Sequence, residues 1–510
     1  MTGTDDDGAA VLIERLGSLR EQLLDIADEW GPSAQGCNPD PDRDASARNL
    51  LQYLALRGHD LREVQEPLVA LGLSSLGRSE GHVQATIDAV LDALGALARN
   101  PPASKSEPPI GFAHSREVLA RRTATLLGPA PQGRPTRIMV TMPTEAATDP
   151  QLVQQMLGAG MDCMRINCAH DAAPAWTAMV ENLRRAEELT ERPARVAVDL
   201  PGPKLRTGPL PAYAAHDKKG AYLRLAVGDR LVLVREEDAG APGPDDDAAR
   251  IGCSLPEAFS VTRPGHAVWL DDGKLGGVVE SVDHDSIQLR IADAGPKGSK
   301  LRAEKGINLP DAELEIDLLG SHSAEALTFA AAHADIVELS FISRPHDVER
   351  VHTYLEENGR PGVGMVLKIE TRRAFEQLPG LLLAALAGDR PAGVMIARGD
   401  LAVECGFERL AEVQEEILWL CQAAHVPVIW ATQVLDQLAR TGRPSRAEIT
   451  DAAMGVRAEC VMLNKGPRIV AAISVLDDIL RRMDRHQRKK RPLLPRLGVS
   501  DYAPILEEAR

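Results

Sequence analysis

Two short apolar runs of this chain lead into charged residues that could carry chemistry. The run "GMVLKIE" ends in Lys368 and Glu370, and the run "GVMIARG" is followed by Asp400. Residues at i and i+2 of a strand share one face, so Lys368 and Glu370 are expected to point the same way. Two carboxylates on adjacent strand ends form a hard oxygen site that suits Mg²⁺ or Mn²⁺. With Arg165 and Arg206 as further cations, the pattern predicts a metal-assisted site for an anionic, phosphorylated ligand.

The elements that position these residues are eight apolar runs separated by amphipathic stretches. Nearly continuous apolar character is typical of parallel strands covered on both faces. Eight such β–α units predict the α/β class and a (β/α)8 TIM barrel. The runs span residues 136–142, 162–167, 195–200, 335–341, 364–370, 393–399, 426–432 and 459–464.

Polar side chains mark the ends of most of these runs. Catalytic residues of such barrels lie at the carboxyl ends of the strands, which meet at one mouth when the barrel closes. The alternative is a web of ion pairs around the mouth with no catalytic role. The candidates are Arg165, Asn167, Asp199, Ser340, Lys368, Glu370, Arg398, Asp400, Thr432 and Gln433.

The remaining segments divide the chain further. Residues 1–125 are expected to be a helical N-terminal extension and linker, because apolar residues recur at helical spacing. Residues 126–211 and 307–485 form the expected barrel. Residues 212–306 alternate short β-rich runs with Gly, Asp and Pro turns, which indicates an inserted small β-barrel domain. Residues 486–510 are expected to be a basic, solvated tail.

Composition excludes several classes of protein. The net charge of −16 argues against wholesale binding to nucleic acid or acidic membranes. The N-terminus lacks a signal-peptide pattern, and no apolar stretch approaches the roughly 20 residues of a membrane span. The seven cysteines form no CxxC pair and mostly lie in apolar runs. Buried, reduced thiols and a cytoplasmic location are therefore expected.

A series of sequence blocks resembles the pyruvate kinase family. The blocks are "AGMDCMRINCAHD", "VDLPGPKLRTG", "WLDDGK", "KGINLP", "ELSFISR", "LKIET", "MIARGDLAVE", "VPVIWATQVL" and "RPSRAE". They occur in the family's order across about residues 136–465, and the inserted domain falls where the family has one. The resemblance implies phosphoryl transfer from phosphoenolpyruvate to ADP, giving pyruvate and ATP, with Mg²⁺ or Mn²⁺ as cofactor. It also implies that the inserted domain is a lid that excludes water during transfer.

The resemblance assigns roles residue by residue. It implies that Lys368 stabilises charge beside the transferred phosphoryl group, that Arg165 and the Gly399 backbone hold the phosphate, and that Thr432 lies near the reacting end. The implied catalytic residues are Lys368, Arg165 and Thr432. The implied substrate-binding residues are Arg165, Lys368, Gly399, Asp400, Thr432 and Ser340. The implied metal ligands are Glu370 and Asp400. The implied nucleotide contacts are Asn167, His170, Arg206 and Lys305.

The monovalent-cation region departs from the family's pattern. The family places potassium among an asparagine, a serine, an aspartate and a threonine. Asn167 and Asp199 are kept here, but the serine position is Ala169 and the threonine position is Leu200. The acidic residue of the "GPEIRTG"-type block is Lys204, whose tethered ammonium could replace the ion. Activity without potassium is therefore expected.

Other departures keep alternatives open. The family's final strand ends in Ser-Gly-Glu-Thr where this chain has "MLNKGP" (462–467), and "TMPTEAA" (141–147) replaces a small Gly-Pro-Ala-Ser turn. Pro201 replaces a basic residue. The family's C-terminal regulatory domain has no counterpart, so regulation through it is not expected. The alternatives are a metal-dependent lyase or aldolase acting on a pyruvate enolate, and a catalytically impaired metabolite-binding protein. A homo-oligomer built through the barrel or the N-terminal helices is the expected form of self-association.

Overall fold

The eight apolar runs form a closed parallel barrel in the order β1-β17-β16-β15-β14-β13-β3-β2, as the sequence predicts. Its strands are buried along nearly their whole length, which explains their continuous apolar character. The strands are β1 (Arg137–Thr141), β2 (Cys163–Asn167), β3 (Arg195–Asp199), β13 (Ile336–Leu339), β14 (Gly364–Ile369), β15 (Ala392–Ala397), β16 (Val428–Ala431) and β17 (Cys460–Leu463). The computed structural model describes residues 4–34, 41–98, 107–202, 204–239, 248–314, 317–320, 323–358, 360, 362–484, 487–488 and 491–492.

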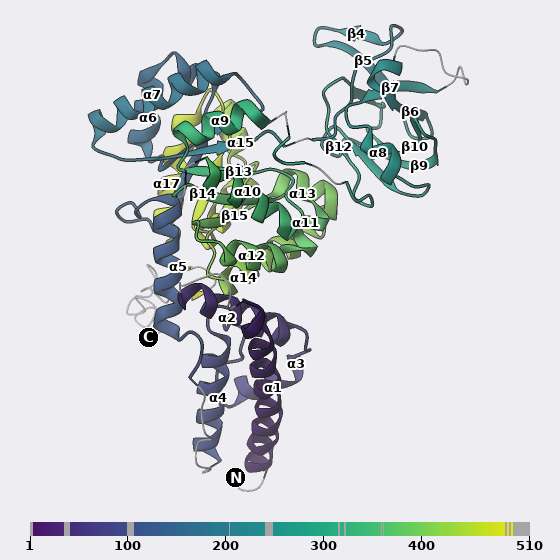
Figure 1. Ribbon diagram of the computed structural model, residues 1–510. Helices are drawn as coiled ribbons and strands as arrows, with labels where there is room; N and C mark the ends of the chain where they lie inside the picture. The colour runs from purple at the N-terminus through teal and green to yellow at the C-terminus, as the bar shows by residue number, and fades with distance from the viewer. Residues whose placement is uncertain are drawn as a thin grey trace, which may run out of the picture.

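Helices surround the barrel, and most connect one strand to the next (Figure 1). They bury their apolar faces against the outer surface of the strands in a core continuous with that of the N-terminal helices. The helices of this layer are α6 (Pro150–Ala159), α7 (Ala173–Thr190), α9 (Ala324–His333), α10 (Pro345–Glu357), α11 (Arg372–Glu376), α12 (Leu378–Ala387), α13 (Arg398–Cys405), α14 (Leu410–Ala423), α15 (Asp436–Thr441), α16 (Arg446–Met454) and α17 (Ile469–Asp484).

The amino end of the barrel is closed by α5 (Phe112–Leu127). Leu126 and Leu127 are almost fully buried in a cluster with inward-facing residues of the strands. Leu126 fits against two glycines that open neighbouring strands: a Cβ on Gly364 would lie 2.4 Å from one of its methyl groups, and a Cβ on Gly393 would lie 2.6 Å from the other. The floor of the barrel is therefore built by a segment that precedes the first strand.

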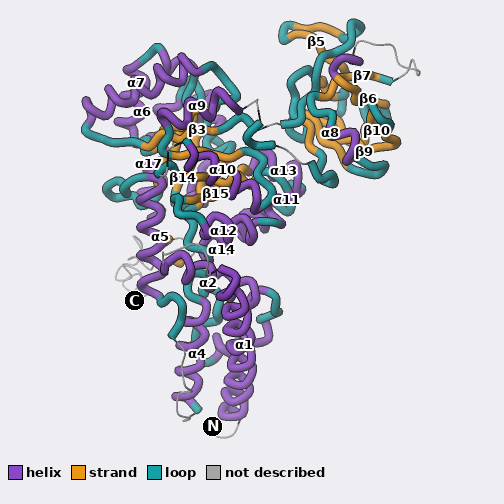
Figure 2. The backbone as a smooth tube through the Cα atoms, in the orientation of Figure 1, coloured by secondary structure: helices purple, strands orange, loops and turns teal. Residues whose placement is uncertain are grey.

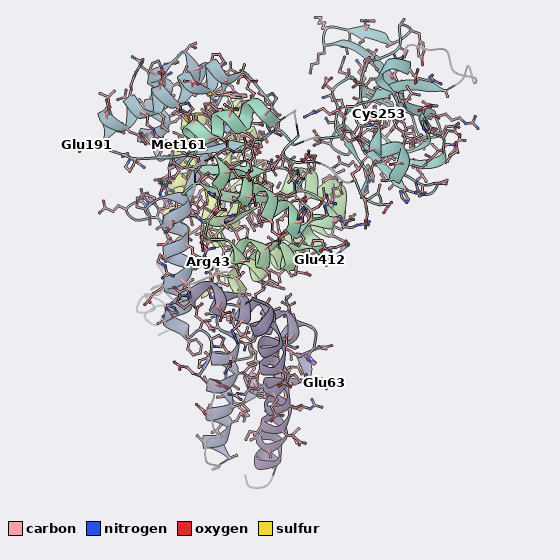
Figure 3. All side chains as sticks on the ribbon, in the orientation of Figure 1. Arg43, Glu63, Met161, Glu191, Cys253 and Glu412 are labelled. Carbon is pink, nitrogen blue, oxygen red and sulfur yellow. The ribbon has the colours of Figure 1, made fainter. Side chains whose placement is uncertain are left out.

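The described regular elements of the N-terminal extension are helices, and they project from the barrel at the side away from the inserted domain (Figure 2). It contains α1 (Thr4–Ala34), α2 (Pro41–Arg57), α3 (Arg62–Ala70) and α4 (Val83–Leu97). Helix α1 packs on α2 and α4, and α2 packs on α12 and α14 of the barrel layer. At this junction, where Figure 3 labels Arg43, its guanidinium donates to the Arg390 carbonyl at 3.1 Å.

Buried polar contacts join these helices to the loop after α14. The ring of His425, which is fully buried, lies 3.0 Å from the hydroxyl groups of Ser46 and Ser115 and 2.9 Å from the Gly81 carbonyl. Asn49 donates from its side chain to the Ala423 carbonyl at 2.8 Å. Because these buried groups hydrogen-bond across the junction, the N-terminal helices are an integral layer on the barrel.

The inserted domain, in which Figure 3 labels Cys253, follows β3 and is rich in strands. Its strands form a six-stranded sheet, ordered β12-β8-β9-β10-β6-β7, and a three-stranded sheet, ordered β11-β5-β4. The described strands form these two sheets around one shared apolar core, where the sequence predicts a small β-barrel. The elements are β4 (Ala215–Asp217), β5 (Gly220–Leu225), β6 (Arg230–Arg235), β7 (Ala249–Cys253), α8 (Glu257–Val261), β8 (Ala267–Leu270), β9 (Leu275–Val282), β10 (Ser286–Ala294), β11 (Ser299–Leu301) and β12 (Ile307–Asn308).

Three further sequence predictions concern the cysteines, membrane-spanning helices and the C-terminal tail. Cys163, Cys168, Cys253, Cys421 and Cys460 are free and buried, as expected, and Cys405 is free and half-buried; Cys37 lies outside the described residues. No described helix is both long and apolar enough to cross a membrane. The expected tail, 486–510, lies outside the described residues except for the short pair β18 (Gln487–Arg488) and β19 (Arg491–Pro492).

Replacing Leu126 by alanine should destabilise the barrel, because it empties the space between two strand-opening glycines that the strands cannot easily close. The expected loss is about 2–5 kcal/mol, seen as a lower urea midpoint of the main unfolding transition. The matched control is Leu97→Ala, since the Leu97 side chain is 54% exposed and should cost less than about 0.5 kcal/mol. Equal midpoints for the two variants would contradict the role given to α5.

Candidate active site

Arg165 lies at the centre of the barrel mouth and is held by three other strands or strand ends. Its Nε donates to Glu338 Oε2 at 2.7 Å, Nη1 donates to Thr141 Oγ1 at 2.8 Å, and Nη2 donates to Asp199 Oδ2 at 2.5 Å. The register explains the meeting, because Thr141 and Arg165 are paired residues of β1 and β2, and Asp199 and Glu338 are paired residues of β3 and β13. The guanidinium therefore has a single fixed orientation.

Lys368 continues the same cluster on the far side of Asp199. Its ammonium lies 3.0 Å from Asp199 Oδ1, 2.6 Å from Ser340 Oγ and 3.0 Å from Glu370 Oε1. Lys368 and Glu370 therefore contact each other at the mouth, as the spacing predicts. The result is a row of alternating charges, from Glu338 through Arg165, Asp199 and Lys368 to Glu370, which we call the charge row.

Every member of the charge row is at least nine-tenths buried, and this fixes its protonation. Burial alone would lower the pKa values of Arg165 and Lys368, but Asp199 and its neighbouring carboxylates raise both above their ordinary values. Burial would raise the pKa of Asp199, but Lys368 and Arg165 hold it below its usual range. Both cations and the carboxylate between them are therefore charged across the neutral range.

Glu370 and Asp400, the expected metal ligands, come together at this mouth. Burial raises the pKa of Glu370, and the negative charge of Asp400 adds to that shift. Each carboxylate already contacts an ammonium group: Glu370 pairs with Lys368, and Asp400 pairs with Lys204. Both carboxylates therefore lie where a positive charge can pair with them, and a divalent ion would pair with the same oxygens. Two carboxylates are a donor set that fits Mg²⁺ or Mn²⁺.

The protein by itself supplies only part of a metal site. In the described part of the chain, no group of three or more His, Cys, Asp or Glu side chains is placed to hold a metal ion. Magnesium is commonly bound by one or two carboxylates, with water and substrate oxygens completing its shell. Two carboxylates at an open mouth suit that mode of binding.

Two bulky residues at the mouth have left-handed backbone conformations. Phe341, with φ of 57°, directs its N–H to Glu370 Oε2 at 2.8 Å. Thr432, with φ of 63°, directs Oγ1 to the Gly399 N–H at 2.8 Å. Such conformations are costly for branched or aromatic residues and cluster at functional sites. Here they orient a carboxylate and the start of α13.

Arg398 fixes the backbone around Thr432. Its guanidinium donates to the Ala431 and Thr432 carbonyls at 2.9 and 2.7 Å, pairs with Asp451, and lies over the Trp430 ring. Arg398 is therefore a supporting residue at the strand end. The Gly399 N–H, which the resemblance assigns to substrate phosphate, is donated to Thr432 in this structure.

The residues assigned to the nucleotide lie at the mouth and at the base of the inserted domain. Asn167 Oδ1 accepts from the Ala169 N–H at 3.0 Å, Arg206 donates to the Glu304 carbonyl at 3.0 Å, and Lys305 pairs with Asp271 at 3.2 Å. Arg206 therefore lies in the segment that leads into the inserted domain, and Lys305 lies between β11 and β12 of that domain.

His170 is exposed beside β2, yet partial desolvation lowers its pKa, and the positive charges of Lys465, Arg206 and Arg165 lower it further. Lys465 belongs to the altered segment after β17. The altered segment therefore carries a positive charge that acts on His170.

Sequence reasoning missed four residues of this site. Thr141 and Glu338 bind Arg165, Phe341 binds Glu370, and Lys465 lies near His170. The one available signal was Glu338, a carboxylate inside the otherwise apolar run "DIVELSF". Thr141 and Lys465 lie in the altered segments "TMPTEAA" and "MLNKGP", although neither pattern gives a role to the residue, and Phe341 has no distinguishing pattern.

The inserted domain is joined to the barrel beside this site. Asn308 donates from its side chain to Glu404 Oε1 at 2.9 Å, and burial raises the pKa of Glu404. A Cβ on Gly273, in the loop between β8 and β9, would lie 3.3 Å from Val403 of α13. The closed parallel barrel, its charged mouth and the adjoining inserted domain define a TIM-barrel enzyme that handles an anionic substrate.

Comparisons with known proteins specify the family. The family described as "Pyruvate kinase, barrel domain" matches residues 133–467. The chain is 32% identical over 363 residues to a pyruvate kinase of Mycobacterium tuberculosis, covering 69% of this chain and 72% of that protein. It is 31% identical over 362 residues to one of Methylorubrum extorquens (69% and 70%), and 27% identical over 322 residues to one of Clostridium acetobutylicum (63% and 63%). The chain belongs to the pyruvate kinase family and is a pyruvate kinase-like phosphotransferase.

Asp199→Asn should destabilise the protein by about 3–5 kcal/mol at pH 7.5, because it leaves Arg165 and Lys368 buried without their shared carboxylate. The folded-state pKa of Asp199 is depressed, so its contribution is complete above the unfolded pKa of about 4 and is lost as the pH falls below it. The deficit in urea midpoint should thus be constant from pH 5.5 to 7.5 and smaller at pH 3.5. Asp293→Asn, an exposed control, should change little. A deficit independent of pH would refute this electrostatic account.

Proposed function

We propose that this protein transfers the phosphoryl group of phosphoenolpyruvate to ADP, giving pyruvate and ATP. The single observation that carries the proposal is the charge row, which places two permanently charged cations beside the paired carboxylates Glu370 and Asp400. Phosphoryl transfer depends on positioning and neutralising anionic oxygens more than on covalent chemistry by the protein. The mouth of this barrel supplies both.

Arg165 and Lys368 are assigned to the phosphoryl group. Arg165 uses three of its five N–H donors within the protein, which leaves one on each terminal nitrogen for phosphate oxygens. Lys368 stays protonated and is held against Asp199, so its charge is available without reorganisation during the reaction. Glu370 and Asp400 would hold Mg²⁺ or Mn²⁺, which supplies charge neutralisation for the phosphate and enolate oxygens.

The inserted domain is assigned the role of a lid over this mouth. Arg206 lies in the segment that leads from the barrel into the inserted domain, and Lys305 lies between β11 and β12 of that domain, so they would meet the ADP phosphates as the lid closes. Closure would also exclude water from the transferred group. Thr432 is assigned to the reacting end of phosphoenolpyruvate, where its strained backbone holds it in place. The comparisons contain nothing that favours the lyase or aldolase alternative.

The decisive assay mixes the purified protein with phosphoenolpyruvate, ADP and Mg²⁺ and follows pyruvate and ATP together. Equal production of both is expected, and Lys368→Met should lower kcat by at least about 10²–10³-fold, because it removes a fixed positive charge from the developing transition state. Lys297→Met, which changes an exposed lysine of the inserted domain, is the matched control and should leave the rate unchanged.

Binding of phosphoenolpyruvate without pyruvate formation would overturn the proposed reaction. Pyruvate formed without ATP would also overturn it, because phosphate would then be lost to water and not transferred.

Activity should be independent of potassium, because the tethered ammonium of Lys204 would take the place of the monovalent cation. In the structure Lys204 pairs with Asp400 and lies 5.9 Å from the centre of the Phe341 ring. The measurement compares kcat in potassium-free buffer with kcat after added KCl; a ratio near one is expected. Lys204→Glu should create a potassium requirement. Wild-type activity that collapses without potassium and returns on its addition would contradict the expectation.

A further inference from the structure

Glu338 is the buried residue of the barrel interior that the assigned reaction leaves unused. It lies within β13 and is fully buried, and Oε2 accepts the 2.7 Å hydrogen bond from Arg165 Nε. Oε1 is buried without a hydrogen-bond partner. Burial raises the pKa of this carboxyl, although Arg165 opposes the shift. A carboxyl in this position is costly for a strand core, which indicates that it has a task.

The strand across the barrel offers no carboxylate. The family's final strand ends in Ser-Gly-Glu-Thr, whereas the four residues after Leu463 here are Asn464, Lys465, Gly466 and Pro467. In that register the glutamate position is Gly466. A Cβ on Gly466 would lie 2.6 Å from the Ala439 carbonyl oxygen, so the local backbone excludes a glutamate there.

We propose that Glu338, on a barrel whose final strand offers no carboxylate, is a positioning residue that fixes the orientation of Arg165 for the substrate phosphate. This inference rests on the proposed function. Glu338 acts through Arg165: it takes the Nε–H, while Thr141 and Asp199 each take one terminal N–H. The two remaining N–H groups lie on the terminal nitrogens, which is the paired arrangement that binds two oxygens of one phosphate.

Two variants distinguish the effect of the position of the Glu338 carboxylate from the effect of its charge. Glu338→Gln keeps an oxygen at the same reach from the backbone but removes the charge. Glu338→Asp keeps the charge but withdraws it by one methylene from Arg165. Both substitutions are small, and Asp347→Asn, which alters an equally buried carboxylate in α10, is the matched control for general effects of burial.

The readouts are KM for phosphoenolpyruvate, KM for ADP, and direct binding of phosphoenolpyruvate in the presence of MgCl₂ by calorimetry. Glu338→Asp should weaken phosphoenolpyruvate binding and raise its KM by about 10–100-fold, the effect of losing a charge-assisted hydrogen bond. Glu338→Gln should stay within about threefold of wild type, because Nε keeps its acceptor. KM for ADP should change less than about threefold in both, and Asp347→Asn should match wild type throughout.

If Glu338→Gln bound phosphoenolpyruvate more weakly than Glu338→Asp, the charge of Glu338 would matter and not its position. That result would overturn the inference. Unchanged binding in both variants, equal weakening in both, or an equal effect on ADP would overturn it as well. The binding titration keeps this test separate from the reaction itself. A wild type that binds phosphoenolpyruvate but forms no pyruvate would refute the proposed function, while the order of the two variants in binding would still decide the role of Glu338.

Discussion

The site depends on one constraint, namely that two cations are buried at the barrel mouth and must be neutralised there. Arg165 and Lys368 share Asp199, and each has a second carboxylate on its outer side. Removing water from charges is costly unless each is paired and hydrogen-bonded, so the five groups stabilise one another and restrict one another's geometry. The same pairing that allows burial also fixes the position of the remaining N–H groups of Arg165. Stability and readiness for an anionic substrate therefore have the same physical origin.

The backbone around the charge row orients polar groups of the site. Phe341 and Thr432 adopt left-handed conformations that isolated residues of their type avoid, and each aims one polar group at a neighbour in the site. Arg398 in turn binds the carbonyls around Thr432. Strain of this kind persists only where packing over-determines the backbone. The closed barrel, with its apolar floor and its outer layer of helices, provides that packing.

The two appended parts relate to the barrel differently. The N-terminal helices are joined to it by buried contacts around His425, and α5 completes the barrel floor, so this part is bound into the core. The inserted domain has its own core and meets the barrel near the site through Asn308, Glu404 and the Gly273 loop. A domain with a separate core can move relative to its neighbour, which is what the proposed lid requires.

The sequence alone determined the barrel, because eight apolar runs separated by amphipathic helices have few other ways to bury their faces. It also determined that Lys368 and Glu370 share a face, since side-chain direction in a strand has a period of two. The alternating runs of the inserted segment predicted a small β-barrel, and its described strands form two sheets around one core. Alternation shows where strands are and not which of them pair.

Only the tertiary structure decided the partners of Arg165. Closure places β13 beside β3 although an inserted domain separates them in the chain, and that pairing brings Glu338 to the guanidinium. The same holds for Lys204, whose contact with Asp400 forms between distant segments. Which charged residues pair depends on their distance in space. The sequence predicts a pair only when the two residues lie on one element at a spacing that matches its periodicity, as Lys368 and Glu370 do.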